Sequence, residues 1–177
     1  METKTKSAQS QNQNKKHSGT TPSSSTAHGS NTKDATSLLR ADHKLVSGLF
    51  AEYEKTTSKT KKEQIVEQIC NELTVHAQVE EEIFYPAVKQ ALRDHELVPE
   101  AIVEHATLKD LISQLEAGEP DDEMYDARIK VLSEYVHHHV QEEQNEIFPK
   151  AKASNLDMVE LGARLNQRKA ELLAERA

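Results

Sequence analysis

Two matching segments, each embedded in an apolar stripe, constrain this chain more than any other feature of its sequence. HAQVEEEIFYP at 76–86 aligns without a gap to HVQEEQNEIFP at 139–149, so that a histidine, a glutamate four residues later and a proline recur. A lone histidine precedes each segment: His43 lies 33 residues before the first segment, and His105 lies 34 residues before the second. This self-similarity predicts two equivalent halves that bring the same polar groups to the same place.

Each segment places a histidine and a glutamate four residues apart, as His76 with Glu80 and His139 with Glu143. Residues at this spacing on an α-helix differ by about 40° in direction and by roughly 6 Å along the axis, so their side chains reach a common point. The flanking residues of the stripe, such as Leu73, are apolar, which predicts that the polar groups face the core. The alignment also selects His139 from the run of three histidines that it ends.

The spacing of apolar residues predicts helices through most of the chain. Five Gly, five Pro and 4% aromatic residues, with an abundance of Glu, Lys, Gln, Ala and Leu, favour helix over strand. Pro86 and Pro149 are expected to bend or break two of the helices. Four long helices with short connections predict an all-α, up-down-up-down four-helix bundle with an extra C-terminal helix. The expected helices cover approximately residues 34–56, 60–85, 98–118, 120–148 and 156–173.

The first 33 residues differ in composition from the rest. They are mostly Ser, Thr, Gln, Asn, Lys and Gly, and they cannot bury enough apolar surface to offset chain entropy. We therefore expect residues 1–33 to form a disordered polar tail and residues 34–177 to form the helical bundle with its C-terminal helix. Asp34 is expected to cap the first helix.

Charge and composition argue against several classes of protein. The formal net charge of -8 argues against nucleic-acid binding, and no apolar run is long enough to form a membrane span. The single cysteine, Cys70, excludes an internal disulfide and a thiolate-rich zinc site. A thiol that is buried or at the flank of its helix is expected there. The N-terminus lacks the apolar core of a secretory signal, so a cytoplasmic protein is expected.

The inward-facing polar groups predict a metal site. Buried carboxylates are neutralised or cost several kcal/mol unless a cation compensates them. Imidazole and carboxylate donors suit iron or manganese, and six donors are too many for one tetrahedral zinc ion. The sequence therefore predicts two iron ions bridged by glutamates. The candidate metal ligands are His43, His76, Glu80, His105, His139 and Glu143.

The order of these residues resembles that of the hemerythrin-like (HHE cation-binding) family. The family pattern of lone His, HxxxE, lone His and HxxxE is met by His43, HAQVE, His105 and HVQEE, and the resemblance covers roughly residues 35–175. It implies a four-helix bundle with a non-haem di-iron centre, bridged by an oxo or hydroxo group, that binds dioxygen or related small molecules. The expected ligands of the centre are therefore dioxygen, nitric oxide or peroxide.

One position departs from the oxygen-carrying members of that family. They have a second histidine four residues after the position of His105, and this chain has Lys109 there. An open coordination position or a solvent molecule would then replace the missing ligand and make oxidation of the centre easier. Glu146, one turn beyond Glu143, is an alternative carboxylate at the inner face.

Three uses of such a centre stay open on the sequence. The first is a protein that binds or senses dioxygen or nitric oxide, which the lack of a second catalytic set favours. The second is an enzyme that consumes peroxide or oxidises a small substrate, with Glu146 or Glu104 moving protons. The third is iron handling under stress. A ferritin-like site is disfavoured because Glu134 with His137 is the only Glu-x-x-His pair, and it points outward.

Overall fold

The computed structural model describes residues 33–120 and 122–176, and this part of the chain contains helices but no strand. The α-helices are α1 (Ala35–Lys55), α2 (Lys59–Val79), α3 (Tyr85–Leu92), α4 (Leu97–Glu116), α5 (Tyr125–Glu142), α6 (Phe148–Ala153) and α7 (Met158–Arg176). Two short π-helical segments are η1 (Glu80–Phe84) and η2 (Glu143–Ile147). The predicted tail lies outside the described residues, apart from Lys33. No helix within the described residues is both long enough and apolar enough to cross a membrane.

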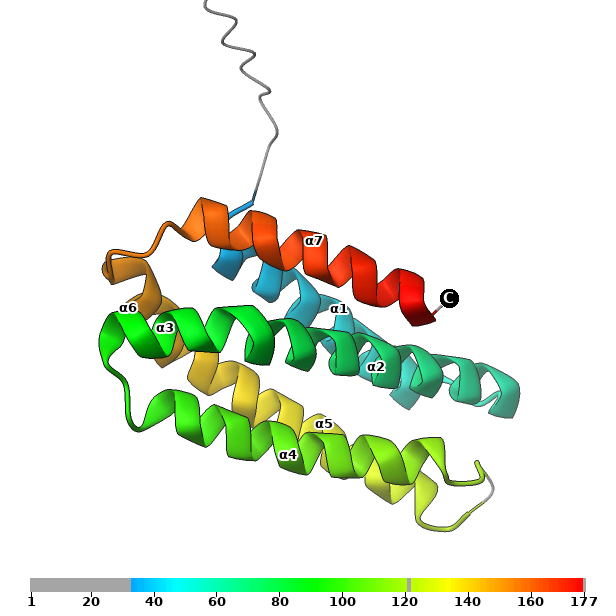
Figure 1. Ribbon diagram of the computed structural model, residues 1–177. Helices are drawn as coiled ribbons and strands as arrows, with labels where there is room; N and C mark the ends of the chain where they lie inside the picture. Colours follow the sequence, from blue (N-terminus) through cyan, green and yellow to red (C-terminus); the bar gives the residue numbers. More distant parts are fainter. Residues whose placement is uncertain (1–32, 121, 177) are drawn as a thin grey trace, which may run out of the picture. The chain divides into compact units, whose positions relative to one another are not determined.

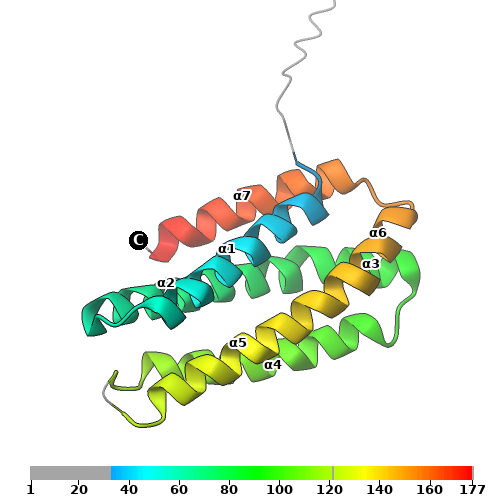
Figure 2. The ribbon, with the colours of Figure 1, turned by 180° about the vertical axis from the view of Figure 1, so that it is seen from behind.

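Four helical arms form an up-down-up-down bundle, as predicted. These arms are α1, α2 with α3, α4, and α5 with α6, and successive arms run in opposite directions (Figure 1). The predicted extra C-terminal helix is α7, which turns back and packs on α1 and α2 (Figure 2). The fold therefore has one helix outside the bundle that covers the pair α1 and α2.

The N-termini of the first two helices are capped by side chains. Asp34 accepts a hydrogen bond from the backbone N–H of Ser37 at 3.0 Å, which satisfies one free donor of the first turn of α1. Ser58 caps α2 in the same way. The fourth arm starts at Tyr125 rather than near residue 120, because residues 117–120 and 122–124 belong to the connection from α4.

The two prolines, which were expected to bend or break their helices, do not interrupt the helical backbone. The backbone stays in the right-handed helical region from α2 into α3 and from α5 into α6, with a π-turn immediately before each proline. The N–H of Tyr85 bonds to the carbonyl of Glu80, five residues back, and the N–H of Phe148 bonds likewise to Glu143. A wider π-turn gives room to the proline ring, which would clash with the carbonyl four residues back in a regular α-helix.

The core consists of two apolar clusters with a polar layer between them. His43 on α1 lies between Leu39 of one cluster and Val46 of the other, and His76 on α2 lies between the clusters in the same way. The first cluster, here the Val46 cluster, includes Val46, Phe50, Ile69, Leu73, Leu108 and Val136. The second, here the Leu39 cluster, includes Leu39, Val79, Phe84, Val98, Phe148 and Leu165. The polar layer is therefore shielded from water on both sides.

Candidate metal centre

The six predicted ligand residues meet in this polar layer. They come from α1, α2 with η1, α4, and α5 with η2, so all four arms contribute. Both glutamates are fully buried, at 0% exposure. The residues are His43, His76, Glu80, His105, His139 and Glu143, all buried.

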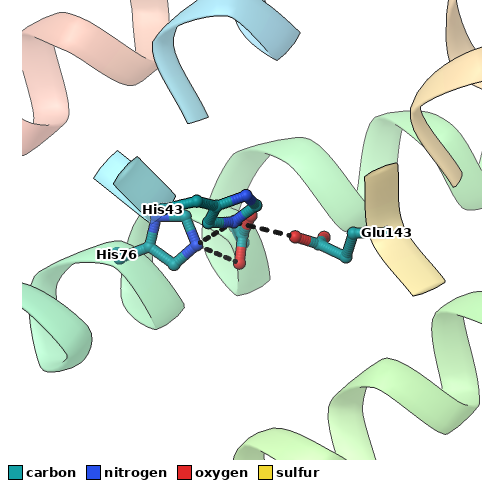
Figure 3. Close-up of side chains that lie close together, drawn as sticks. His43, His76 and Glu143 are labelled. Atoms are coloured by element: carbon teal, nitrogen blue, oxygen red, sulfur yellow. Dashed lines mark hydrogen bonds and ion pairs between the residues drawn. The ribbon is translucent and has the colours of Figure 1, made fainter. Parts of the chain in front are cut away.

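One half of the layer is built around His43 and His76. Their Nε2 atoms lie 3.0 Å apart, and Figure 3 shows the two imidazoles with these nitrogens close together and Glu143 pointing toward them from the fourth arm. Nε2 of His43 is 3.2 Å from Oε2 of Glu143. Nε2 of His76 is 3.2 Å from Oε2 of Glu80. One ligand atom from each of these four residues lies within 4.8 Å of all the others.

The other half has the same plan. Nε2 of His105 lies 3.1 Å from Nε2 of His139 and 3.4 Å from Oε2 of Glu80. Nε2 of His139 lies 3.8 Å from Oε2 of Glu143. Each carboxylate therefore contacts imidazoles of both halves, as expected of a bridge between two sites.

The pKa values of the two buried carboxylates are shifted in opposite directions. Burial, and then the negative charge of Glu143, raise the pKa of Glu80 well above its usual value. Burial also opposes ionisation of Glu143, but the nearby Nε2 of His43, at 3.2 Å, and the other imidazoles hold its pKa below the usual value. The layer thus carries negative charge on a fully buried carboxylate.

Burial also keeps two of the imidazoles neutral. It lowers the pKa of His76 and, together with the charge of His139, lowers the pKa of His105 to about 4. Burial would lower the pKa of His139 as well, but the hydrogen bond with Glu104 raises it. A neutral imidazole has a free ring nitrogen to offer, which is the form that binds metals.

The geometry of the donor atoms fits metal ions. Bonds of about 2.1 Å at a right angle place two nitrogens about 3.0 Å apart, close to the 3.0 Å and 3.1 Å of the two Nε2 pairs. Among the described residues, Oε1 of Glu80 and Oε2 of Glu143 accept no hydrogen bond, although both are buried. Buried polar atoms in proteins are rarely left this way. The residues present therefore fit the cations that the sequence predicts.

The two π-turns bring an aromatic ring over each half of the layer. Because a π-turn returns to the same face after about five residues, Tyr85 lies over Glu80 and Phe148 lies over Glu143. The Phe148 ring stacks on the His43 ring, with centroids 5.8 Å apart and planes 3° apart. The Tyr85 ring lies 5.3 Å from the His105 ring. The aromatic rings thus follow the same repeat as the ligands.

Tyr85 adds a polar group that the sequence analysis did not place in the site. Its hydroxyl donates to Oε1 of Glu143 at 2.9 Å, and it lies 3.3 Å from Nε2 of His105 and 3.4 Å from Oε2 of Glu80. Burial and the two carboxylate charges raise its pKa well above the usual value, so the phenol keeps its proton. The matching position in the second half is Phe148, so the hydroxyl distinguishes the halves.

The Nδ1 atom of each of the four imidazoles, on the side of the ring away from the other ligands, has a polar side chain beside it. In metal sites such partners fix the ring orientation and the tautomer. Three of the four partners here are carboxylates, and the fourth is an amide. The Nδ1 pairs are His43 with Gln144 at 3.0 Å, His76 with Asp42 at 3.5 Å, His105 with Glu81 at 3.0 Å, and His139 with Glu104 at 2.7 Å.

Two residues of the sequence analysis lie outside the layer. Lys109, at the position of the missing histidine, is 45% exposed and pairs with Glu81 at 2.6 Å. Glu146 is 52% exposed and faces Lys150 at 3.4 Å, so its expected place on the inner face is wrong. The π-turn between Glu143 and Glu146 uses more residues per turn than an α-helix, and this rotates Glu146 toward solvent.

The other histidines of the α5 run are exposed, while His139 is buried. His137 bonds to Gln141 at 3.0 Å. His138 lies at the surface between Glu104, at 3.4 Å, and Glu142, at 3.3 Å. His137 and His138 are thus placed on the surface, as the sequence predicts.

A small cavity adjoins the ligands on the side of the Val46 cluster. It has a volume of about 20 Å³, which is room for about one water-sized molecule. A depression of about 240 Å³ between α1 and α5 opens to the surface and shares His43, Val136 and Val140 with the cavity. The cavity walls include all four imidazoles and the apolar Val46, Leu73, Leu108, Val136 and Val140.

A helical bundle with a buried layer of histidine and glutamate side chains belongs to the class of bundle proteins that hold cations inside. Residues 34–151 match the family described as the hemerythrin HHE cation binding domain, and the chain belongs to this family. This confirms the resemblance seen in the sequence.

Two known proteins are similar to the chain. A protein of Nostoc sp. (strain PCC 7120) named DNA nickase is 31% identical over 111 residues, which are 63% of this chain and 31% of that protein. The chain therefore spans about a third of that relative. The crystal structure of a hemerythrin HHE cation binding domain-containing protein from Mycobacterium kansasii has a TM-score of 0.70 at 21% identity and covers 81% of this chain and 89% of that one. This structure shows the same fold.

Proposed function

We propose that the chain holds two non-haem iron ions in the polar layer and binds dioxygen or nitric oxide at the reduced pair. The observation that carries the proposal is the pair of fully buried carboxylates, Glu80 and Glu143, each in contact with imidazoles of both halves. A buried carboxylate without a compensating charge costs several kcal/mol, and metal cations in the layer would supply that charge.

The donor set supports iron and a count of two. Neutral imidazoles with bridging carboxylates suit iron, and no thiolate belongs to the layer. His43 and His76 would hold one ion, and His105 and His139 the other. The carboxylates of Glu80 and Glu143 would span both ions, together with an oxo or hydroxo bridge.

The surroundings of the layer support a small ligand. A reduced iron pair held in the layer would supply electrons to a diatomic molecule that binds to it. The cavity of about 20 Å³ admits a ligand of that size, and its valine and leucine walls exclude larger polar molecules. Lys109 points away from the layer, so the half with His105 keeps the open position at which such a ligand would bind.

Metal analysis followed by anaerobic spectroscopy tests the proposal. The full chain should bind about two iron ions, and its reduced form should change its visible spectrum on exposure to dioxygen or nitric oxide. His76→Ala should lose iron and the spectral change, while His137→Ala, which changes an exposed histidine, should keep both. A wild-type protein that binds iron but shows no spectral change with either gas would refute gas binding.

Peroxide consumption is a second candidate, and the Tyr85 hydroxyl favours it. Disproportionation of two peroxide molecules to dioxygen and two waters needs a proton moved between oxygen atoms, and this hydroxyl lies between Glu143 and His105. Tyr85→Phe should then lower the rate of peroxide consumption about 10²-fold or more while leaving the iron content unchanged. Equal rates in the two proteins would exclude a role for the hydroxyl in turnover.

We do not extend the nicking of DNA to this chain. The formal net charge of -8 opposes contact with phosphates, and the matched region is 31% of the relative that carries that name. The purified chain should not retard duplex DNA in a gel at low salt, and retardation would reopen the question.

A further inference from the structure

The C-terminal helix contacts the metal-ligand segments through two consecutive residues. α7 follows the family match, which ends at residue 151, and it packs on α1, α2 and η1. Lys169 and Arg168 each reach a carboxylate on the bundle beside a predicted ligand. α7 is therefore more than a cover for the apolar surface of α1 and α2.

Lys169 belongs to a chain of polar contacts that ends at a predicted ligand. Its Nζ lies 2.7 Å from Oδ1 of Asp42 and 3.5 Å from Oε2 of Glu72. The other oxygen of Asp42 lies 3.5 Å from Nδ1 of His76. The side chains of Lys169, Asp42 and His76 are only 16%, 11% and 6% exposed, so solvent screens these contacts weakly.

Arg168 makes the second connection. Its Nε lies 2.7 Å from Oε2 of Glu82, and its Nη2 lies 3.3 Å from the other oxygen. Glu82 belongs to η1, which begins at Glu80. This bidentate pair holds the π-turn against α7.

The carboxylates that lie beside imidazole Nδ1 atoms are Asp42, Glu81 and Glu104, and their basic partners come from different helices. Glu81 pairs with Lys109 of α4, and Glu104 contacts His138 of α5, so both partners belong to the four arms. Asp42 takes its ammonium partner from α7. Among the described residues, α7 thus supplies the ammonium group that pairs with the carboxylate beside His76.

We propose that metal occupancy of the layer and docking of α7 strengthen each other through Lys169, Asp42 and His76. The inference rests on the proposed metal centre. Nδ1 of His76 and Oδ2 of Asp42 are 3.5 Å apart and form no hydrogen bond as they stand. A cation held at Nε2 of His76 would leave the ring proton on Nδ1, facing Asp42, and its positive charge would strengthen the attraction between the two side chains. Lys169, at 2.7 Å from Oδ1, holds the carboxylate of Asp42 in the position from which its other oxygen faces His76. Lys169 is a positioning residue in this scheme.

Thermodynamic linkage requires that the effect of α7 docking on iron affinity equals the effect of bound iron on α7 docking. If a docked α7 raises the affinity for iron by some factor, bound iron must favour docking by the same factor. Couplings between sites in proteins usually fall between about 5-fold and 150-fold. The occupied and the empty centre would therefore present different C-terminal helices to a partner, so occupancy could be read at the surface.

Hydrogen exchange of the full chain tests the docking side. Backbone amides of α7 should exchange about 5-fold to 150-fold more slowly after anaerobic loading with ferrous iron. This protection should be largely lost in Lys169→Met and kept in Arg164→Met, which removes the same charge from an exposed position of α7. Equal protection in these two variants would overturn the proposal.

Chelator competition tests the metal side. Lys169→Met should raise the dissociation constant for ferrous iron by the same factor, and Lys169→Arg should restore most of the affinity. In an Asp42→Asn background the Lys169→Met change should have little further effect, because the path runs through Asp42. An additional loss of the same size in that background would refute the path. If Lys169→Met folds poorly, Asp42→Asn alone still tests the path, because it should raise the dissociation constant for ferrous iron and an unchanged constant would refute it.

The outcomes separate the two proposals. If the wild-type chain binds two iron ions and the exchange of α7 does not change, the coupling is wrong and the centre stands. If the wild-type chain binds no iron in the same titration, the proposed centre itself is wrong.

Discussion

Two glycines of this chain should respond in opposite ways to the same substitution. A Cβ atom on Gly162 of α7 would lie 2.4 Å from the carbonyl oxygen of Lys33, 2.9 Å from the nitrogen of Ala35 and 3.0 Å from the carbonyl carbon of Asp34. All three are backbone atoms, so no side chain can rotate away. A Cβ atom on Gly48, exposed on α1, would meet nothing within 4 Å.

The magnitudes follow from two opposing effects. Replacing glycine by alanine inside a helix stabilises it by about 1 kcal/mol, which is the whole effect expected for Gly48→Ala. Overpacking costs typically about 1–3 kcal/mol, and three close backbone contacts place Gly162→Ala at the upper end. We therefore expect a net destabilisation of about 1–2 kcal/mol, or a fall in Tm of roughly 2–8 °C.

Denaturant unfolding of the metal-free proteins measures both free energies of unfolding. Hydrogen exchange would show whether the loss in Gly162→Ala is concentrated in α7. If Gly162→Ala were as stable as Gly48→Ala, the close approach of α7 to the start of α1 would not exist, and the placement of Lys169 over Asp42 would lose its support.

Three further predictions concern titration, the missing ligand and the thiol. In the metal-free protein His105, with a pKa of about 4 against 6.5 for the free side chain, should contribute about 3 kcal/mol of stability above pH 6.5. This stability is lost as the pH falls toward 4, because the unfolded state binds the proton first. Urea unfolding at a series of pH values between 6.5 and 4 should show that the free energy of unfolding falls less steeply with decreasing pH in His105→Gln than in the wild-type chain. Lys109→Ala should leave the iron content unchanged on metal analysis and cost less than about 1 kcal/mol, because its pair with Glu81 is exposed. Cys70, whose pKa burial raises to about 12, should react with a thiol reagent at pH 8 only at the rate of unfolding, and a fast reaction in the folded protein would contradict its burial.

The sequence was sufficient for the arrangement that depends on helical periodicity. The four-residue spacing of His76 and Glu80, inside an apolar stripe, determines both that they point the same way and that they point inward. The repeat then distinguished His139 from two neighbours of the same type, and only His139 is buried of the three.

Helical periodicity could not predict where side chains point at the two π-turns, because the backbone departs from the α-helical repeat there. Tyr85 follows a π-turn and Glu146 lies within one. Such a turn changes the face of the helix on which a residue lies, so helical periodicity predicts neither the place of Tyr85 in the layer nor the exposure of Glu146. A proline after an HxxxE motif in both halves was the available signal for a wider turn. The partners of the Nδ1 atoms, such as Asp42, depend on how whole helices rotate against each other, which no local pattern records.

The matched aromatic positions Tyr85 and Phe148 bear on how a duplicated scaffold acquires asymmetric chemistry. The two π-turns give both positions the same relation to their glutamate, so the backbone treats the halves alike. A single oxygen atom then makes one half a hydrogen-bond donor and leaves the other a hydrocarbon wall. For protein design this separates two tasks: the repeat specifies where the histidine and glutamate side chains meet, and one atom outside the repeat pattern makes the two halves chemically different.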